Sequence, residues 1–282
     1  MAWLPAASLL LGCGDGAFGD GHAGAARHPA LSEAVASTAE ALEQCAAQTV
    51  EGIDVFDGQG AIDWAAVADG GIAFAMIKAT QGTYDTQSTF AANWLGAERA
   101  GVRRGAYHFF DPTEDGAAQA QHFLAAVGPL AAADLPPMLD LECPDGDADC
   151  LGTGASGAAA PASIASRVAA WIASVEGATG RRPLVYTFAS YFASSGVDAG
   201  GLEAYPLFLA YPTTGACFSV PAPWQRATMW QYAWTGTVSG VSTAVDRDRF
   251  LGSPADLAAL STLAAPSLQA VADAAAPATG CH

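Results

Sequence analysis

A series of eight short apolar runs constrains the fold of this chain more than any other feature. Each run has the length of a β-strand, and the runs cover residues 50–55, 72–79, 105–110, 137–141, 183–188, 206–210, 228–232 and 244–250. Segments with the 3.6-residue apolar period of a helix separate several of the first five runs, at 88–100, 116–127 and 162–176. Strands that alternate with helices predict a parallel sheet. Because the last three runs follow one another closely, we predict an α/β fold, a TIM-like barrel with an irregular closing part.

The segments that flank this series have a different composition and divide the chain into four parts. Residues 14–49 are rich in Gly, Ala and Ser and are predicted to be a tether, with a helix over 31–47. Residues 257–282 are rich in Ala and are predicted to be a tail that begins with a helix. The barrel domain is therefore expected to cover 50–256, behind a short signal at 1–13.

The N-terminal stretch ends in Leu10-Leu11-Gly12-Cys13, which resembles a bacterial lipobox, where the cysteine is lipidated after cleavage of the signal. Its context is incomplete, because no Lys or Arg precedes Cys13 and a signal peptide usually starts with positive charge. An exported lipoprotein, anchored to the membrane through Cys13, is the preferred interpretation. Export without a lipid and a cytoplasmic location stay open as alternatives.

The net charge of −17 restricts the class of partner. Binding of phosphate groups needs clustered Lys and Arg, so this charge argues against nucleic acid or anionic lipid as the main partner. No apolar run reaches the roughly 18 residues that are needed to span a bilayer. No coiled coil or repeat is present, and we expect a monomer.

The chain has six cysteines, and disulfides among them would agree with an oxidising compartment. Cys143 and Cys150 lie seven residues apart in a loop rich in Gly and Asp, and they are candidates for a small disulfide. No CxxC pair is present, so a structural zinc site is not expected. Neither a metal nor a cofactor is predicted.

Carboxylates at the predicted strand ends are the candidate catalytic groups. In a barrel of this type, active-site residues lie at the carboxyl-terminal ends of strands, which selects Asp54, Asp140, Glu142 and Asp246. Asp140 and Glu142 share one face of a strand, roughly 6.6 Å apart along the chain. When two carboxylates lie close together and partly buried, one pKa rises, and such a pair can protonate a leaving oxygen while it stabilises positive charge. A metal site built from the same carboxylates is an alternative, but no His lies at a ligand spacing.

Aromatic and polar side chains near these strand ends suit a sugar, whose C–H faces stack on rings and whose hydroxyl groups need donors and acceptors. The predicted substrate-binding residues are Lys78, Tyr107, Phe109, Tyr186, Tyr211, Trp230, Gln231 and Tyr232. Strand alternation places Trp230 and Tyr232 on one face and Gln231 on the other. Some of these aromatic residues must belong to the core.

The order of these segments, from residue 51 to residue 252, resembles the glycoside hydrolase family 25 lysozymes, the Chalaropsis-type N-acetylmuramidases. The matching pieces include GIDV at 52–55, IKATQG at 77–82, RGAYHF at 104–109, LDLE at 139–142, WQY at 230–232 and VDRDRF at 245–250. The resemblance implies a flattened (β/α)5β3 barrel that hydrolyses the β-1,4 bond between N-acetylmuramic acid and N-acetylglucosamine in peptidoglycan. It also assigns the acid of the family to Glu142 and its partner to Asp140, with Asp54 and Asp246 as the other two acids.

Two routes for the second step stay open. Because both acids lie on one side of the bond, attack by the N-acetyl carbonyl of the substrate, oriented by Asp140, is preferred over a carboxylate that acts as nucleophile or as base. Two rival functions also remain. A non-catalytic cell-wall glycan-binding module on the same barrel would predict a broken D-x-E pair. A barrel hydrolase of another class, such as a chitinase, would predict a longer acidic strand motif before Asp140.

Overall fold

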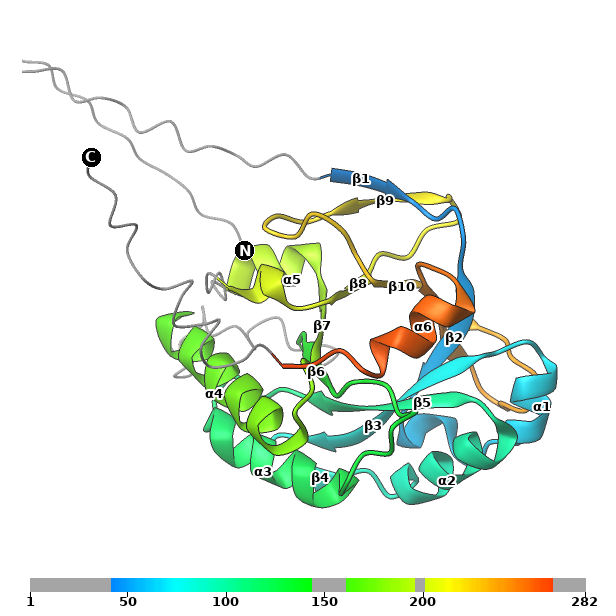
Figure 1. Cartoon of the computed structure of the whole chain (residues 1–282), viewed down its shortest axis with the longest axis horizontal. Helices are drawn as coiled ribbons and strands as arrows, with labels where there is room; N and C mark the ends of the chain where they lie inside the picture. The colour runs from blue at the N-terminus through cyan, green and yellow to red at the C-terminus, as the bar shows by residue number, and fades with distance from the viewer. Residues whose placement is uncertain (1–41, 144–160, 196–200, 266–282) are drawn as a thin grey trace, which may run out of the picture. The chain divides into compact units, whose positions relative to one another are not determined.

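The computed structural model describes residues 42–143, 161–195 and 201–265. In this part of the chain eight strands close into a barrel (Figure 1). The barrel strands are β2 (Val50–Val55), β3 (Phe74–Gln81), β5 (Arg103–Phe109), β6 (Met138–Leu141), β7 (Leu184–Phe188), β8 (Leu207–Ala210), β10 (Met229–Gly236) and β11 (Val245–Phe250). The predicted α/β barrel is confirmed, and each of the eight apolar runs overlaps one of its strands.

Seven of the barrel strands are parallel, and the eighth reverses direction. β2, β3, β5, β6, β7, β8 and β10 pair in parallel in that order, while β11 runs antiparallel between β10 and β2. The helices after the first five strands are α1 (Trp64–Asp69), α2 (Phe90–Ala100), α3 (Gly116–Val127), α4 (Pro161–Thr179) and α5 (Ala189–Ser195). Short elements complete this part: β4 (Asp85–Thr86) pairs with the end of β3, and single 3-10 turns cover Asp57–Gln59 and Leu202–Ala204. This is the (β/α)5β3 order that the resemblance implies.

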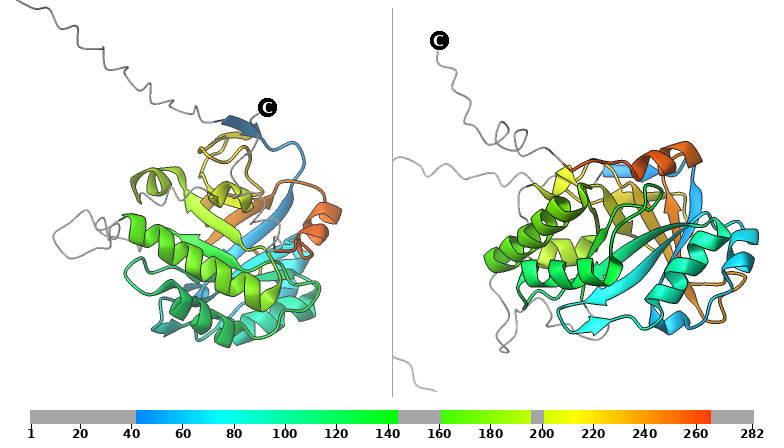
Figure 2. Two further views of the ribbon diagram at one scale, coloured as in Figure 1. Left: turned by 60° about the vertical axis from the view of Figure 1, so that its left-hand side comes forward. Right: turned by 60° about the horizontal axis from the view of Figure 1, so that its bottom comes forward.

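Local signals in the sequence set the ends of the helices that cover the barrel (Figure 2). The Asp115 side chain caps α3 by accepting a hydrogen bond from the backbone N–H of Ala118. Gly101 ends α2 in the left-handed conformation, with a φ of 75°. α3 and α4 pack so closely that a Cβ on Gly116 would lie 1.8 Å from the carbonyl oxygen of Arg167. Within the described ranges, no helix is long and apolar enough to cross a membrane.

Alternation along the strands fills one end of the barrel and brings polar side chains to the other. On β3, Phe74 and Met76 belong to the inner cluster of buried side chains, whereas Ala75 and Ile77 belong to the cluster that packs against the helices. The next inward position is Lys78, which lines a pocket at the carboxyl-terminal end of the strand. The barrel is therefore a packed core with one functional rim.

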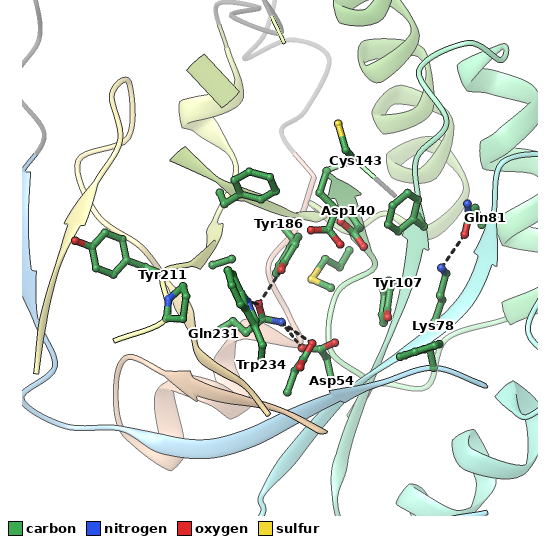
Figure 3. Close-up of a pocket in the computed structure, with 18 of the residues that line it drawn as sticks. Asp54, Lys78, Gln81, Tyr107, Asp140, Cys143, Tyr186, Tyr211, Gln231 and Trp234 are labelled. Carbon is green, nitrogen blue, oxygen red and sulfur yellow. Dashed lines mark hydrogen bonds between the residues drawn. The ribbon is translucent and has the colours of Figure 1, made fainter. Parts of the chain in front are cut away.

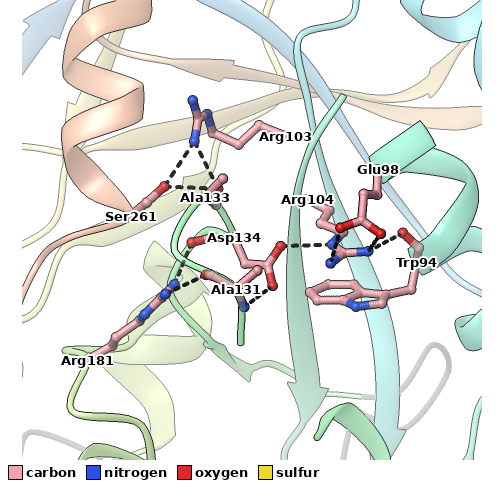
Figure 4. A network of polar contacts seen from close by, with 9 residues as sticks. All are labelled: Trp94, Glu98, Arg103, Arg104, Ala131, Ala133, Asp134, Arg181 and Ser261. Carbon is pink, nitrogen blue, oxygen red and sulfur yellow. Dashed lines mark hydrogen bonds and ion pairs between the residues drawn. The ribbon is translucent and has the colours of Figure 1, made fainter. Parts of the chain in front are cut away.

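At the amino-terminal end of the barrel strands, charged groups are paired (Figure 4). Arg104, near the start of β5, is buried; its Nε donates to Oδ1 of Asp134 at 2.8 Å, and its guanidinium lies 4.2 Å from the centre of the Trp94 ring. It also pairs with Glu98 on α2. Arg181, which follows α4, donates to the backbone carbonyl of Asp134. A buried charge is tolerated when it is paired and hydrogen-bonded, so this network connects β5, α2, α4 and the loop before β6.

Secondary structure is present before the predicted barrel boundary at residue 50. β1 (Leu42–Cys45) pairs antiparallel with β9 (Cys217–Val220), and a disulfide joins Cys45 to Cys217. The helix predicted over 31–47 is therefore wrong for residues 42–45, because pairing with a distant strand overrides a local apolar pattern. The tether predicted over 14–49 is likewise wrong for residues 42–45, which form β1. Residues 14–41 of this tether and the signal at 1–13 lie outside the described residues.

The packed body also continues beyond residue 256. The helix expected at the start of the tail is α6 (Pro254–Leu260), and its Leu257 and Leu260 side chains are buried. After it, the backbone N–H of Ala265 donates to the carbonyl of Gly180. This helix therefore belongs to the barrel body, and the tail predicted from residue 257 starts too early. Residues 266–282 lie outside the described part.

Candidate active site

A pocket of about 1310 Å³ opens at the carboxyl-terminal ends of the parallel strands (Figure 3). Each of the eight barrel strands contributes a residue to its lining. Ten of the twelve predicted catalytic and substrate-binding residues line it: Asp54, Lys78, Tyr107, Phe109, Asp140, Glu142, Tyr186, Tyr211, Gln231 and Asp246. The structure thus brings the four predicted acids together in one cleft.

Asp246 reaches this rim in a way that differs from the prediction. It stands near the amino-terminal end of β11, whereas the rule that selected it concerns carboxyl-terminal ends. Because β11 runs antiparallel to β2, the register places Asp246 opposite Asp54. Reversal of the last strand therefore brings its first carboxylate to the end of the first barrel strand.

Asp140 and Glu142 form the acidic pair at the end of β6. Asp140 is 4% exposed, and Glu142 follows the strand directly and is partly exposed in the pocket. Oδ1 of Asp140 is buried and has no hydrogen-bond partner among the described residues. Burial and the neighbouring charge of Glu142 hold the pKa of Asp140 well above its usual value, although Lys78 opposes this shift. We infer that this pair keeps a proton when exposed carboxylates have lost theirs.

Gln231 connects the other two pocket acids. Its Nε2 donates to Oδ2 of Asp54 at 2.7 Å and to Oδ2 of Asp246 at 3.3 Å. Burial raises the pKa of Asp54 to about 6, although the hydrogen bond from Gln231 favours the ionised form. Asp54 is therefore poised to change its charge near neutral pH.

Asp248 is a fifth carboxylate that the sequence reasoning missed. It stands two residues after Asp246 on β11, is fully buried, and its oxygens accept no hydrogen bond from a described residue. Burial and the nearby charges of Asp54 and Asp246 hold its pKa well above the usual value. The signal was present, because the spacing of two that places Asp140 and Glu142 on one face also applies to Asp246 and Asp248.

Lys78 and two tyrosines supply hydrogen-bond donors in the pocket. Nζ of Lys78 donates to Oε1 of Gln81 at 2.8 Å and lies 4.5 Å from the centre of the Phe109 ring. Burial lowers the pKa of Lys78, and the charge of Asp140 opposes this shift. Burial and the pocket carboxylates hold the pKa values of Tyr107 and Tyr186 well above the usual range, so both hydroxyl groups stay protonated.

Two exposed aromatic rings at the pocket were not among the predicted site residues. Phe56 and Trp234 both line it, with 45% and 57% of their surface exposed. The Phe56 ring rests on Gly58, where a Cβ would lie 2.4 Å from the ring. Their exposure beside a polar pocket leaves ring faces available to a ligand.

Trp230 and Tyr232 do not line the pocket, and the expectation that they bind substrate is not supported by their positions. Trp230 is fully buried in the outer core and donates from Nε1 to the carbonyl of Tyr211 at 2.7 Å. The Tyr232 hydroxyl donates to Glu51 at 2.8 Å, and the Arg249 guanidinium lies 4.0 Å from its ring centre. The predicted alternation is correct, but it directs Gln231 inward and both aromatic neighbours outward.

The disulfide between Cys143 and Cys150 and the lipidation of Cys13 stay predictions. Cys143 lines the pocket and is disulfide-bonded, while Cys150 and Cys13 lie outside the described residues. In the described part of the chain, one set of three possible metal ligands lies close together, formed by Glu43, Cys45 and Cys217. The disulfide between the two cysteines removes the thiolates that a metal would need.

Comparison with known proteins agrees with this geometry. A family model described as glycosyl hydrolases family 25 matches residues 53–241. The chain belongs to this family. It is therefore a glycoside hydrolase, and the resemblance seen in the sequence is confirmed.

Relatives and solved structures of the family cover most of the chain. Lysozyme M1 of Streptomyces globisporus is 37% identical over 219 residues, which span 75% of this chain and 71% of the relative. N,O-diacetylmuramidase of Chalaropsis sp is 34% identical over 209 residues, spanning 70% and 96%. The crystal structure of the bacterial lysozyme from Streptomyces coelicolor superposes with a TM-score of 0.68 at 36% identity, covering 76% of this chain and 98% of that one.

The raised pKa of Asp54 predicts that this carboxylate destabilises the fold at alkaline pH. The folded state binds the proton of Asp54 more tightly than the unfolded chain does. The stabilisation from this bound proton is therefore fully present below pH 3.8, and it is lost as pH rises through about 6. Asp54→Asn keeps an oxygen that can accept from Gln231. We expect it to increase the free energy of unfolding by about 1–3 kcal/mol at pH 8, and by much less at pH 4.

Urea unfolding at the two pH values measures this difference. Glu43→Gln makes the same charge change at an exposed position on β1 and should leave the free energy of unfolding nearly unchanged at both pH values. An Asp54→Asn variant that is no more stable than the wild type at pH 8 would contradict the prediction.

Proposed function

We propose that the enzyme is a peptidoglycan muramidase that hydrolyses the β-1,4 bond between N-acetylmuramic acid and N-acetylglucosamine. The observation that carries the proposal is the Asp140–Glu142 pair at the end of β6, inside a pocket to which every barrel strand contributes. The lysozyme and N,O-diacetylmuramidase names of its relatives support this choice of substrate. The intact pair also favours an enzyme over a glycan-binding module.

Glu142 is proposed to be the general acid. It is more exposed than Asp140 and faces the pocket from the end of the strand, so it can reach the oxygen of a bound glycosidic bond. The proton goes from Glu142 to the leaving oxygen as the bond between that oxygen and the anomeric carbon breaks. Sharing one proton within the pair keeps the acid loaded at a pH where an exposed Glu is ionised.

Asp140 is proposed to orient the N-acetyl group of the substrate. Both acids leave the same strand end, so neither is placed to attack from the opposite side of the sugar ring. In the substrate-assisted route, the carbonyl oxygen of the N-acetyl group bonds to the anomeric carbon, and Asp140 stabilises the positive charge that develops on the amide. Water then attacks the anomeric carbon and breaks its new bond to the N-acetyl oxygen, and the Glu142 carboxylate takes the proton that the water loses.

The remaining pocket residues are proposed to hold the sugar and the developing charge. Asp54 and Asp246 place negative charge near the cationic transition state. Tyr107, Tyr186 and Lys78 supply donors for hydroxyl or carboxylate groups, and Phe109 and Tyr211 supply ring surface.

The enzyme is proposed to act outside the cytoplasm, on the cell wall. We propose export with an envelope anchor through a lipidated Cys13, and a monomeric enzyme; Cys13 lies outside the described residues. A net charge of −17 provides no long-range attraction to an anionic wall, so binding is expected to depend on contacts in the pocket.

Glu142→Gln tests the role of the acid. It removes the transferable proton and keeps the size of the side chain, so we expect hydrolysis to fall by about 10²–10⁴-fold, while the fold and glycan binding persist. Turbidity of purified peptidoglycan gives the rate, and mass spectrometry of the fragments identifies the cleaved bond. The matched control, Glu43→Gln, should lyse the wall normally.

Lysis by the Glu142→Gln variant at the wild-type rate would remove Glu142 from this role. Binding of glycan by the wild-type enzyme without release of fragments would instead favour the glycan-binding module.

The configuration of the first product tests the substrate-assisted route. Two displacements at the anomeric carbon retain its configuration, so proton NMR recorded from the start of the reaction should show the β-anomer first. The α-anomer should appear later, at the rate of spontaneous mutarotation. An α-anomer at the earliest time points would exclude this route and favour a base-assisted inversion.

A further inference from the structure

We propose that Gln231 is a positioning residue of this site, which holds the Asp54 carboxylate in its ionised form and fixes the Trp234 ring at the pocket, and that it does not bind substrate itself. The expected effect of Gln231 on the reaction rests on the proposed function. Its effect on the ionisation of Asp54 does not, because that effect can be measured without turnover.

The backbone and both neighbours hold Gln231 in place. Its carbonyl accepts from the backbone N–H of Tyr211 at 3.0 Å, and the Trp230 indole donates to the carbonyl of the same Tyr211. On the other side, the Tyr232 hydroxyl is bonded to Glu51. The Gln231 side chain is 2% exposed and points inward between two anchored aromatic residues.

The amide of Gln231 has no hydrogen-bonding capacity left for a substrate. A Gln side chain offers two donors and two acceptor sites. Both donors are directed at carboxylates, Asp54 and Asp246. The oxygen accepts from the Tyr186 hydroxyl at 2.8 Å and from Nε1 of Trp234 at 2.9 Å. A substrate hydroxyl could bond to this amide only by displacing one of these four partners.

The orientation of this amide follows from the chemistry of its partners. An indole N–H is a donor only, so the group that faces Trp234 must be the amide oxygen. The amide nitrogen then faces Asp54, and the opposite orientation would direct two N–H groups at the Trp234 donor. Trp234 is 57% exposed, and this bond fixes the direction of its ring at the pocket.

Gln231 also counteracts the effect of burial on the ionisation of Asp54. The titratable groups that share the site with Asp54 are Asp246 and Asp248 on β11, Asp140 and Glu142 at the end of β6, Lys78 on β3, Tyr107 on β5 and Tyr186 on β7. Burial disfavours the charged form of Asp54, whereas hydrogen bonds from Gln231 and from Asp248 favour it. A donor at 2.7 Å stabilises that form, so loss of Gln231 should make Asp54 take up a proton at higher pH.

Gln231→Leu, combined with Asp54→Asn, tests this coupling without turnover. We expect Gln231→Leu to lower the urea midpoint more at pH 8, where Asp54 is ionised, than at pH 4. In the Asp54→Asn background most of this difference between pH values should disappear. An equal effect of Gln231→Leu at both pH values in the wild-type background would overturn the proposal, whatever the activity.

The pH profile of kcat/KM on peptidoglycan tests the effect on the reaction. Gln231→Leu should move the acid limb upward by about one to two pH units, while Trp234→Phe, which leaves the bond to Asp54 intact, should not move it. Gln59→Leu is the matched control, because Gln59 also lines the pocket, and among the described residues its side chain bonds to backbone groups of Phe56 and Ala244 and to no carboxylate.

Each outcome of this second test has a defined meaning. A raised KM with an unmoved acid limb in Gln231→Leu would show substrate binding and overturn the proposal. If Gln231→Leu does not fold, Gln231→Met replaces it, since Met is similar in size to Gln, stays uncharged and has no donor for Asp54. A wild-type enzyme without hydrolysis would contradict the proposed function alone, because the urea measurement still decides the role of Gln231.

Discussion

The reversed direction of β11 is the constraint on which the rest of the site depends. Seven parallel strands leave a gap between β10 and β2, and β11 fills it with antiparallel pairing on both sides. Closure in this direction brings Asp246 opposite Asp54 and Gln231 opposite Asp248. If β11 ran parallel to its neighbours, Asp246, which stands near its start, would lie at the packed end of the barrel, away from the acidic pair on β6.

Charged side chains are paired with opposite charges at one end of the barrel, whereas carboxylates gather at the other end. Where the strands begin, Arg104 is buried with Asp134 and Glu98 as its partners. Where they end, four carboxylates line the pocket, with Asp248 buried beside Asp54 and Asp246, and Lys78 is the one Lys or Arg side chain in its described lining. Burial and like charges disfavour ionisation and raise the pKa values of Asp54, Asp140 and Asp248. This cost to stability is what makes an acid available at neutral pH.

Much of this arrangement could be predicted from the sequence because its signals are local. Strand-length apolar runs marked all eight barrel strands, and a spacing of two placed Asp140 and Glu142 on one face. The disulfide from Cys45 to Cys217 could not be predicted in this way, since its partners are separated by 172 residues and no local pattern connects them.

The errors at the site have two physical sources. The face of β10 that turns inward depends on its register in the closed barrel, so alternation alone did not show that Trp230 and Tyr232 face outward. Asp248 was accessible to the same reasoning as Asp140. Rings such as Phe56 and Trp234 carry no sequence pattern that separates an exposed ring at a pocket from a core residue.

The central claim is that the pocket acids keep a proton which an isolated carboxylate would lose. Carboxyl ¹³C NMR of the enzyme labelled at Asp and Glu, titrated with pH and assigned with Asp140→Asn and Glu142→Gln, measures this directly. The account predicts that the Asp140 and Glu142 signals together still report one bound proton at a pH at which exposed Asp and Glu residues are ionised. Signals of both residues that are fully ionised in the range of exposed carboxylates would contradict it, because the acidic pair would then hold no proton to donate.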